Sequence, residues 1–288
     1  MALRARSARV ILAAAVLCLQ AACSSTTFLY NRLDTVLPWY VDDYVDLDPA
    51  QQRQLDDLLT PFLAWHRAEE LPRYLALLEK IDTELDTPVS SGEIAAVYAD
   101  VENAWLRLQE ASLEWLLTLG ASLSDEQVRE FLAYLQERQE EFEEEYLERS
   151  EREYREESYE ALATSLQDYL GRLSAEQRLR LRAATLDLQR SDAVWLRERS
   201  AWLQRLEQML QRRPGWQQQV REALVLRDET VSEQYRVTYQ HNLEVIFSAI
   251  ADVLDSRSDK QDQRLRAELA DLRTDLQLLI GQGLASAS

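Results

Sequence analysis

Glycine and proline are scarce in this sequence, with six of each among 288 residues. Together they make up about 4% of the chain, whereas roughly 12% is usual. A β-sheet protein needs many tight turns, which these two residues mostly supply, so a sheet-based fold is excluded. Long stretches without either residue, such as 121–170 and 216–280, predict long helices. We therefore expect an all-α fold, an elongated bundle of long antiparallel helices with helical hairpins and coiled-coil-like packing.

Cysteine is nearly absent, and the two cysteines, Cys18 and Cys23, both lie near the start of the chain. The rest of the protein therefore has no disulfide, no thiolate zinc site and no cysteine nucleophile. A cysteine-free body suits an oxidising compartment, where stray thiols could cross-link.

Basic residues are outnumbered by acidic ones, which gives a formal net charge of −19. Residues 1–22 hold three arginines and no acid, so the remainder carries −19 − 3 = −22. A polyanion of this size does not bind nucleic acid and does not lie flat on anionic lipid through its charge. We expect no nucleic-acid partner.

Long apolar runs are missing after the first 22 residues, and the one near the start is short. Arg4, Arg6 and Arg9 precede the ten apolar residues 10–19, and small residues follow. This order is typical of a secretory signal peptide, here residues 1–22. Ten residues of helix rise about 15 Å, roughly half the ~30 Å core of a bilayer, so a permanent membrane span is not expected.

The leader ends in Leu19-Gln20-Ala21-Ala22-Cys23, which resembles a bacterial lipobox, with Gln20 where Leu is usual. The resemblance implies cleavage before Cys23 and lipidation of its thiol and new amine, and several acyl chains hold a protein firmly on a membrane. Ser24, by resemblance to sorted lipoproteins, favours the periplasmic leaflet of the outer membrane of a Gram-negative bacterium. The alternative is an ordinary cleaved signal peptide with Cys23 left as a free thiol.

Helix starts are marked by a recurring phrase that fits the capping box, in which an N-cap side chain and an N3 Gln or Glu bond each other's backbone amides. The phrases are Asp48–Gln51, Ser90–Glu93, Ser124–Gln127 and Ser174–Gln177. After the second phrase, steps of four and three predict a heptad seam. Its residues are Ile94, Tyr98, Val101, Trp105, Leu108, Ser112, Trp115 and Leu119.

The acidic segment 124–170 predicts one helix of about 47 residues, roughly 70 Å long. The basic segment 174–213 is expected to fold back on it at Gly171 as a helical hairpin, acidic face against basic face. The residues expected to hold the hairpin together are Leu179, Leu186, Trp195, Trp202, Leu206 and Met209.

The leader and the breaker positions also predict the domain organisation. The expected parts are an anchor and short linker (23–34) and a single helical domain (35–288), with compact N-terminal helices (35–120), the hairpin (121–213) and C-terminal helices (214–282).

Candidate chemical groups are few. The aspartate-rich run 42–48 lacks the Gly and the terminal Glu of a calcium loop. His66 lies near Glu69 and Glu70, but in the reverse order to the Glu-x-x-His motif of di-iron bundles, and His241 has no Glu three positions before it. We expect no catalytic, cofactor-binding or metal-binding residue, no cofactor beyond the lipid on Cys23, and no enzyme activity.

A polar cluster is expected around Asn242, with Tyr235, Tyr239 and Arg227 on a neighbouring face. A satisfied network inside the bundle is the simpler interpretation, and contact with a ligand is the alternative.

The segments LPWYVDDYVDLDPAQ (37–51) and WHRAEELPRYLALLE (65–79) resemble an uncharacterised family of proteobacterial helical lipoproteins, over nearly the whole chain. The resemblance supports the fold and the location and implies no activity. Leu123-Ser124-x-x-Gln127 and Leu173-Ser174-x-x-Gln177 also resemble the Leu-Thr-x-x-Gln boxes of small helical periplasmic chaperones.

Three functions remain open. The first is a lipid-anchored, non-enzymatic interaction or scaffold protein with an unidentified protein partner in the cell envelope. The second is a holdase-type chaperone or envelope-stress adaptor, which predicts an exposed apolar groove. The third is a ligand-binding bundle, which predicts a closed pocket with convergent polar groups.

Overall fold

The computed structural model describes residues 25–286, and within this range all regular elements are helices. The predicted all-α fold is confirmed. The elements are α2 (Ser25–Tyr30), α3 (Leu33–Asp42), α4 (Pro49–Trp65), the π-helix η1 (His66–Glu70), α5 (Leu71–Glu84), α6 (Ser91–Ser122), α7 (Asp125–Glu148), α8 (Glu151–Leu170), α9 (Ala175–Asp187), α10 (Asp192–Met209), α11 (Trp216–Val225), α12 (Arg227–Thr230), α13 (Glu233–Asp255) and α14 (Asp259–Ser286). Cys18 and Cys23 lie outside the described residues.

The predicted capping boxes all form, at the starts of α4, α6, α7 and α9. Two further boxes are present. Ser150 and Glu153 cap α8, and Ser258 and Gln261 cap α14, with 3.0 Å from Ser258 N to Gln261 Oε1. Each box satisfies backbone amides that a helix start would leave without a partner.

The predicted single helix over 124–170 is wrong. The backbone turns extended at Arg149 (ψ 141°), and Ser150 starts a new helix. Arg149 donates to Asp192 Oδ2 at 3.0 Å, across from the matching break between α9 and α10. The hairpin is therefore bent at one level on both arms, with α7 against α10 and α8 against α9.

Leu179 and Leu186 do not hold the hairpin together, because both side chains are exposed. The contacts come partly from aromatic rings instead. Phe142 and Tyr146 of α7 contact the Trp195 ring of α10, with ring centroids 5.7 and 6.0 Å apart. The predicted match of acidic and basic faces is present in the half of the hairpin formed by α8 and α9, where Arg182 bonds both carboxylate oxygens of Glu156.

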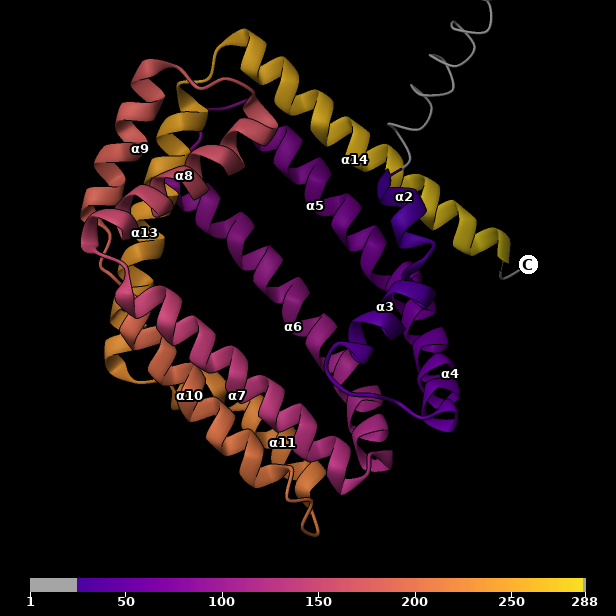
Figure 1. Cartoon of the computed structure of the whole chain (residues 1–288). Coiled ribbons are helices and arrows are strands. Elements are labelled where there is room, and N and C mark those ends of the chain that lie inside the picture. Colours follow the sequence, from indigo (N-terminus) through magenta and orange to yellow (C-terminus); the bar gives the residue numbers. More distant parts are fainter. Residues whose placement is uncertain (1–24, 287–288) are drawn as a thin grey trace, which may run out of the picture.

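The order of helices occurs twice along the chain. In the first unit, α3 to α7, α3 packs on α4 and α4 packs on α6. In the second unit, α8 to α14, α8 packs on α9 and α9 packs on α13, and α11 and α12 are additional helices between α10 and α13. The last helix of each unit crosses over. The first unit's α7 packs on α10, and the second unit's α14 packs on α5 as well as on α8 of its own unit (Figure 1). Helices α6 and α13 also pack on each other, so the molecule has two similar halves, each of which places its final helix on the other half.

The two halves share a paired-glutamine contact. In the first half, Gln51 Nε2 donates to Gln127 Oε1 (3.0 Å) and Ser122 O (2.9 Å), and Gln127 Nε2 donates to Asp46 O (2.6 Å). Each glutamine also closes its own capping box. Each of these glutamine side chains therefore caps the start of its own helix and also binds the start of the neighbouring helix.

The second half repeats these bonds at corresponding positions. Gln177 Nε2 donates to Gln261 Oε1 (3.2 Å) and Ser256 O (3.5 Å), and Gln261 Nε2 donates to Arg172 O (3.2 Å). The match, bond for bond, is independent evidence that the two halves are structural repeats.

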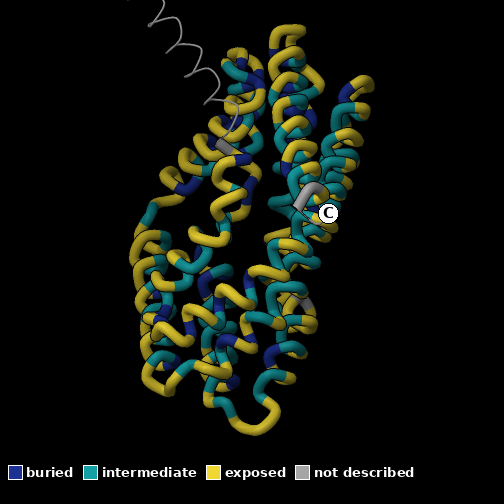
Figure 2. The backbone as a smooth tube through the Cα atoms, turned by 90° about the vertical axis from the view of Figure 1, so that its right-hand side faces the viewer, coloured by how far each residue is buried: buried dark blue, intermediate teal, exposed yellow. Residues whose placement is uncertain are grey.

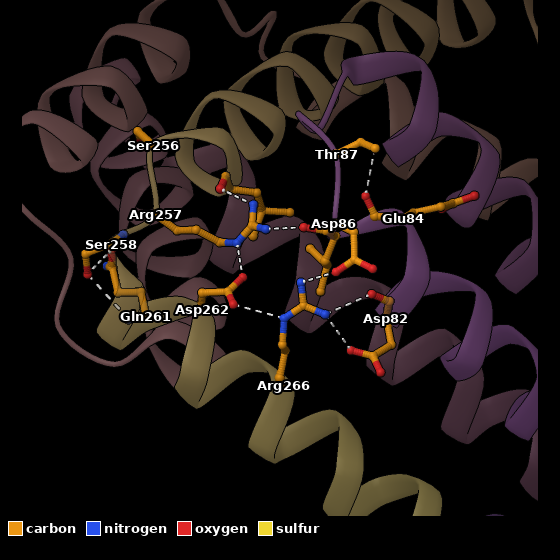
Figure 3. A network of polar contacts seen from close by, with 12 residues as sticks. Asp82, Glu84, Asp86, Thr87, Ser256, Arg257, Ser258, Gln261, Asp262 and Arg266 are labelled. Carbon is orange, nitrogen blue, oxygen red and sulfur yellow. Dashed lines mark hydrogen bonds and ion pairs between the residues drawn. The ribbon is translucent and has the colours of Figure 1, made fainter.

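An arginine network fixes helix α14 against the end of α5 (Figure 3). Arg266 donates to Asp82 Oδ1 (3.1 Å), Asp86 Oδ1 (2.8 Å) and Asp262 Oδ2 (2.9 Å). Arg257 donates to the other oxygen of Asp262 at 2.6 Å. Burial alone would raise the pKa of Asp262. The bonds from the two arginines outweigh this effect, so the pKa of Asp262 is lowered.

The core consists of separate apolar clusters rather than one central mass, and buried residues alternate with exposed ones along the helices (Figure 2). The predicted seam of α6 is only partly buried. Leu119 packs in a cluster with Leu55 and Leu59 of α4, whereas Val101 and Trp105 are 53% and 57% exposed. The middle of α6 runs across the molecule between its two edges (Figure 1). Heptad spacing predicts an apolar face on α6, but the spacing alone does not bury that face.

Candidate functional site

A single π-helical turn, η1, interrupts the α-helical hydrogen bonding between α4 and α5. The Leu71 amide donates to the His66 carbonyl, five residues back, so one turn is a π-helix. Pro72 follows at once and has no amide to continue the regular bonding pattern. Single π-turns often occur at functional sites, and this one places His66 and Glu70 within the protein.

Glu70 is a fully buried carboxylate, with 0% of its side chain exposed. Arg107 of α6 binds it through two bonds, Nε to Oε1 (2.9 Å) and Nη2 to Oε2 (2.8 Å). Arg73 makes a further ion pair from α5. The Arg107 hydrogen bond is the main reason that the pKa of Glu70 is lowered, although burial opposes it. The carboxylate is therefore held in its charged form.

His66 lies beside this ion pair among aromatic side chains. Its Nδ1 is hydrogen-bonded to the Tyr30 hydroxyl at 2.8 Å, and its Nε2 is 3.5 Å from the Tyr74 hydroxyl. Burial lowers the pKa of His66, so the neutral ring is favoured. Burial also raises the pKa of both tyrosines. His66 thus joins α2, η1 and α5, and within residues 25–286 no group of three or more His, Cys, Asp or Glu side chains is placed to hold a metal ion.

A cleft of about 650 Å³ runs between α5 and α6 next to the ion pair. Arg73, Tyr74 and Arg107 line one part of it, and Leu77 and Leu106 add apolar surface. Lys80 spans the cleft to Asp100, with 2.7 Å between Nζ and Oδ2. The cationic side chains are paired within the protein, so the cleft offers a mixed surface rather than an anion site.

The aspartate-rich run 42–48 has structural contacts in the fold. The Asp48 carboxylate caps α4 by accepting from the Ala50 amide at 2.7 Å, and Gln127 bonds the Asp46 carbonyl. Tyr44, within the run, shares a 2.8 Å bond with the Tyr40 hydroxyl, which raises the pKa of Tyr44 to about 12.

Asn242 and its neighbours join α13 to the connection between α9 and α10. Asn242 accepts from the Gln189 amide and donates to the Gln189 carbonyl, both at 2.8 Å. His241 Nε2 is 2.8 Å from the Asp187 carbonyl, and the Tyr239 hydroxyl is bonded to Tyr98. Tyr235 stacks on Tyr239. The bonds of Asn242 and of Tyr239 go to separate partners, so the single cluster expected around Asn242 stays a prediction.

From the sequence, His66 and Glu70 are considered only as metal ligands and no site is predicted there, and their partners Arg107 and Tyr30 are not identified. The available signal is Arg107 itself, a charged residue between Leu106 and Leu108 on a helix with an apolar face. A cation in that position needs a counter-charge in the packed protein.

No helix within residues 25–286 has the length and apolar character needed to cross a membrane. The fold and the site together define an all-helical protein with repeated halves, in which buried charges are bound by arginines. The chain belongs to the family of unknown function DUF6279, whose profile matches residues 43–236. This confirms the resemblance to an uncharacterised family, and the matched range includes His66, Glu70 and Arg107. No significant match was found among curated proteins or among solved structures.

Proposed function

We propose that the mature protein is lipid-anchored at Cys23 in the periplasmic leaflet of the outer membrane and acts by binding another envelope protein, not by catalysis. The observation that carries the proposal is the exposed apolar middle of α6. Val101 and Trp105 lie four residues apart, hence on one face of the helix, and more than half of each side chain is exposed. Exposed tryptophans of this kind often anchor protein–protein interfaces.

The buried acids support binding over catalysis. A general base needs a free carboxylate with a pKa near the working pH. Glu70 is bound by Arg107 and Arg73, and Asp192 by Arg149 and Arg190. Burial alone would raise the pKa of Asp192, but these arginine bonds outweigh it and lower that pKa. Such carboxylates are committed to holding helices together.

The lipid anchor is tested by the change Cys23→Ser. We expect the variant to carry no acyl mass and to leave the outer-membrane fraction, because a serine cannot form the thioether to the lipid. The measurement is intact-mass analysis together with membrane fractionation. Cys18→Ser is the control and should still be lipidated. A Cys23→Ser protein that still sediments with the outer membrane contradicts the anchor.

The protein partner is tested by a photo-crosslinking amino acid placed at Trp105 in living cells. Leu179 of α9, 67% exposed, is the control position because it has similar exposure outside the α6 surface. We expect one envelope protein in stoichiometric amount at position 105 and none at position 179. If neither position yields a protein adduct, the binding role of α6 is wrong.

A holdase-type chaperone is the second candidate, and the same exposed surface of α6 favours it. The two functions differ in the products of this experiment. Many unrelated unfolded clients at position 105 indicate a chaperone, and one defined partner indicates a scaffold. The ligand-binding bundle has less support, because the cleft between α5 and α6 is open and its cations are paired.

A further inference from the structure

We infer that α2 and α3 form a membrane-contacting surface whose exposed aromatic side chains lie among lipid headgroups; this rests on the proposed lipid anchor. The first argument is distance. Helix α2 begins at Ser25, two residues after Cys23, and two residues of extended chain span about 7 Å. A lipid on Cys23 therefore holds the start of α2 close to the bilayer.

The second argument is that α2 is fixed to the body of the protein. Thr27 Oγ1 donates to Asp275 Oδ1 of α14 at 3.2 Å, and Asn31 donates to Gln282 at 2.9 Å. Arg67 of η1 donates to Asn31 Oδ1 at 2.8 Å and lies over the Tyr30 ring. The anchor thus continues into a helix that is bonded at several points, which orients the whole molecule relative to the membrane.

The third argument is which aromatic side chains remain outside. Tyr30, Tyr44, Phe62, Trp65 and Tyr74 make ring contacts within the protein. Phe28 of α2 and Trp39 of α3 are instead 62% and 67% exposed, with Leu29 exposed beside Phe28. Tyr40 is also exposed, although its ring contacts Tyr44. Trp and Tyr prefer the boundary between hydrocarbon and water, where the ring is buried and its polar group stays hydrated.

The charges around this surface define the kind of contact. Arg32 lies over the Phe28 ring at 5.4 Å, but Asp34 is exposed on the next helix. With a net charge of −22 after the leader, anionic lipid does not attract the protein. The contact is therefore apolar insertion of side chains at the headgroup level, and high salt should not weaken it.

The test uses the natively lipidated full chain reconstituted into phosphatidylethanolamine and phosphatidylcholine vesicles. The thiol of Cys23 is blocked by its lipid, so the change Trp39→Cys introduces a single free thiol for an environment-sensitive dye. Leu179→Cys on α9 is the matched control, because Leu179 and Trp39 are equally exposed at 67%. In Figure 1 α9 lies on the opposite side of the molecule from α2 and α3.

We expect the dye at position 39 to shift its emission to the blue and to lose emission when the vesicles contain brominated lipid, at low and high salt alike. The dye at position 179 should do neither. If the protein floats with the vesicles but position 39 behaves like position 179, the membrane surface is wrong and the anchor stands. If position 39 is shielded only in native envelopes, a protein covers it and the inference is again overturned. A chain without acyl mass that does not float refutes the anchor itself.

Discussion

Arg107→Met is expected to lower the free energy of unfolding by about 3 kcal/mol. Breaking a buried ion pair typically costs roughly 3–5 kcal/mol, because the remaining charge loses its partner in a place that water cannot reach. Here the remaining charge is Glu70, which has no exposed surface. Arg73 still contacts it, but the Arg73 side chain is 48% exposed, so its compensation is partial. We therefore place the loss at the lower end of that range.

Glu70→Gln is the matched variant and should cost less, about 1–2 kcal/mol. Glutamine keeps a hydrogen-bond acceptor and has nearly the same shape, and the unpaired charge is now on Arg107, whose side chain is 35% exposed and stays hydrated. The order of the two losses follows from which partner is buried. Chemical denaturation of both variants measures it, and a greater loss for Glu70→Gln than for Arg107→Met refutes this account of the pair.

The same pair predicts a difference in acid stability. The pKa of folded Glu70 is lowered from 4.5, with the Arg107 bond as the main cause. The unfolded chain therefore binds more protons here, so this contribution is complete above about pH 4.5 and is lost as the pH falls through the folded pKa. The wild-type protein should lose stability more steeply than Glu70→Gln below pH 4.5. Parallel slopes in that range mean that Glu70 does not titrate as inferred.

The helix starts were the most predictable part of this fold. A capping box depends on residues three positions apart, so local sequence suffices, as at Ser90 and Glu93. The break at Ser150 had the same signal, since Glu153 stands three positions later. The surrounding run of charged, helix-favouring residues nevertheless predicts one continuous helix.

The packing of each final helix on the other half could not be predicted in the same way. The packing of α14 on α5, in addition to α8 of its own unit, depends on contacts between residues far apart in sequence, such as Arg266 with Asp82. Heptad spacing predicts which face of α6 is apolar but not whether another helix covers that face. Trp105 is therefore predicted to be buried, whereas its side chain is exposed. The Glu70 site could not be predicted for the same reason, because its partner Arg107 lies on another helix.

Gln177→Ala should destabilise the protein by about 3 kcal/mol, since a buried donor or acceptor left without a partner costs roughly 1–3 kcal/mol. Gln177 is fully buried, with 0% exposed. Its amide nitrogen donates to Val253 O at 3.2 Å, and its oxygen accepts from Ser174 N at 2.9 Å and from Gln261 Nε2 at 3.0 Å. Alanine leaves all three groups without this partner and opens a cavity at the junction of α9, α13 and α14.

A thermal scan should show the midpoint of Gln177→Ala lowered by about 6–12 °C, at about 2–4 °C per kcal/mol for a chain of this size. Gln208→Ala is the control, because Gln208 is exposed on α10 and its loss should change stability by at most about 0.5 kcal/mol. Gln177→Glu should be at least as damaging as alanine, since a carboxylate cannot donate to the Val253 carbonyl. Adding Gln261→Ala to Gln177→Ala should cost less than the sum of the two single changes, because the residues share bonds. Strict additivity would mean that the paired glutamines do not act as one unit joining the two helix starts.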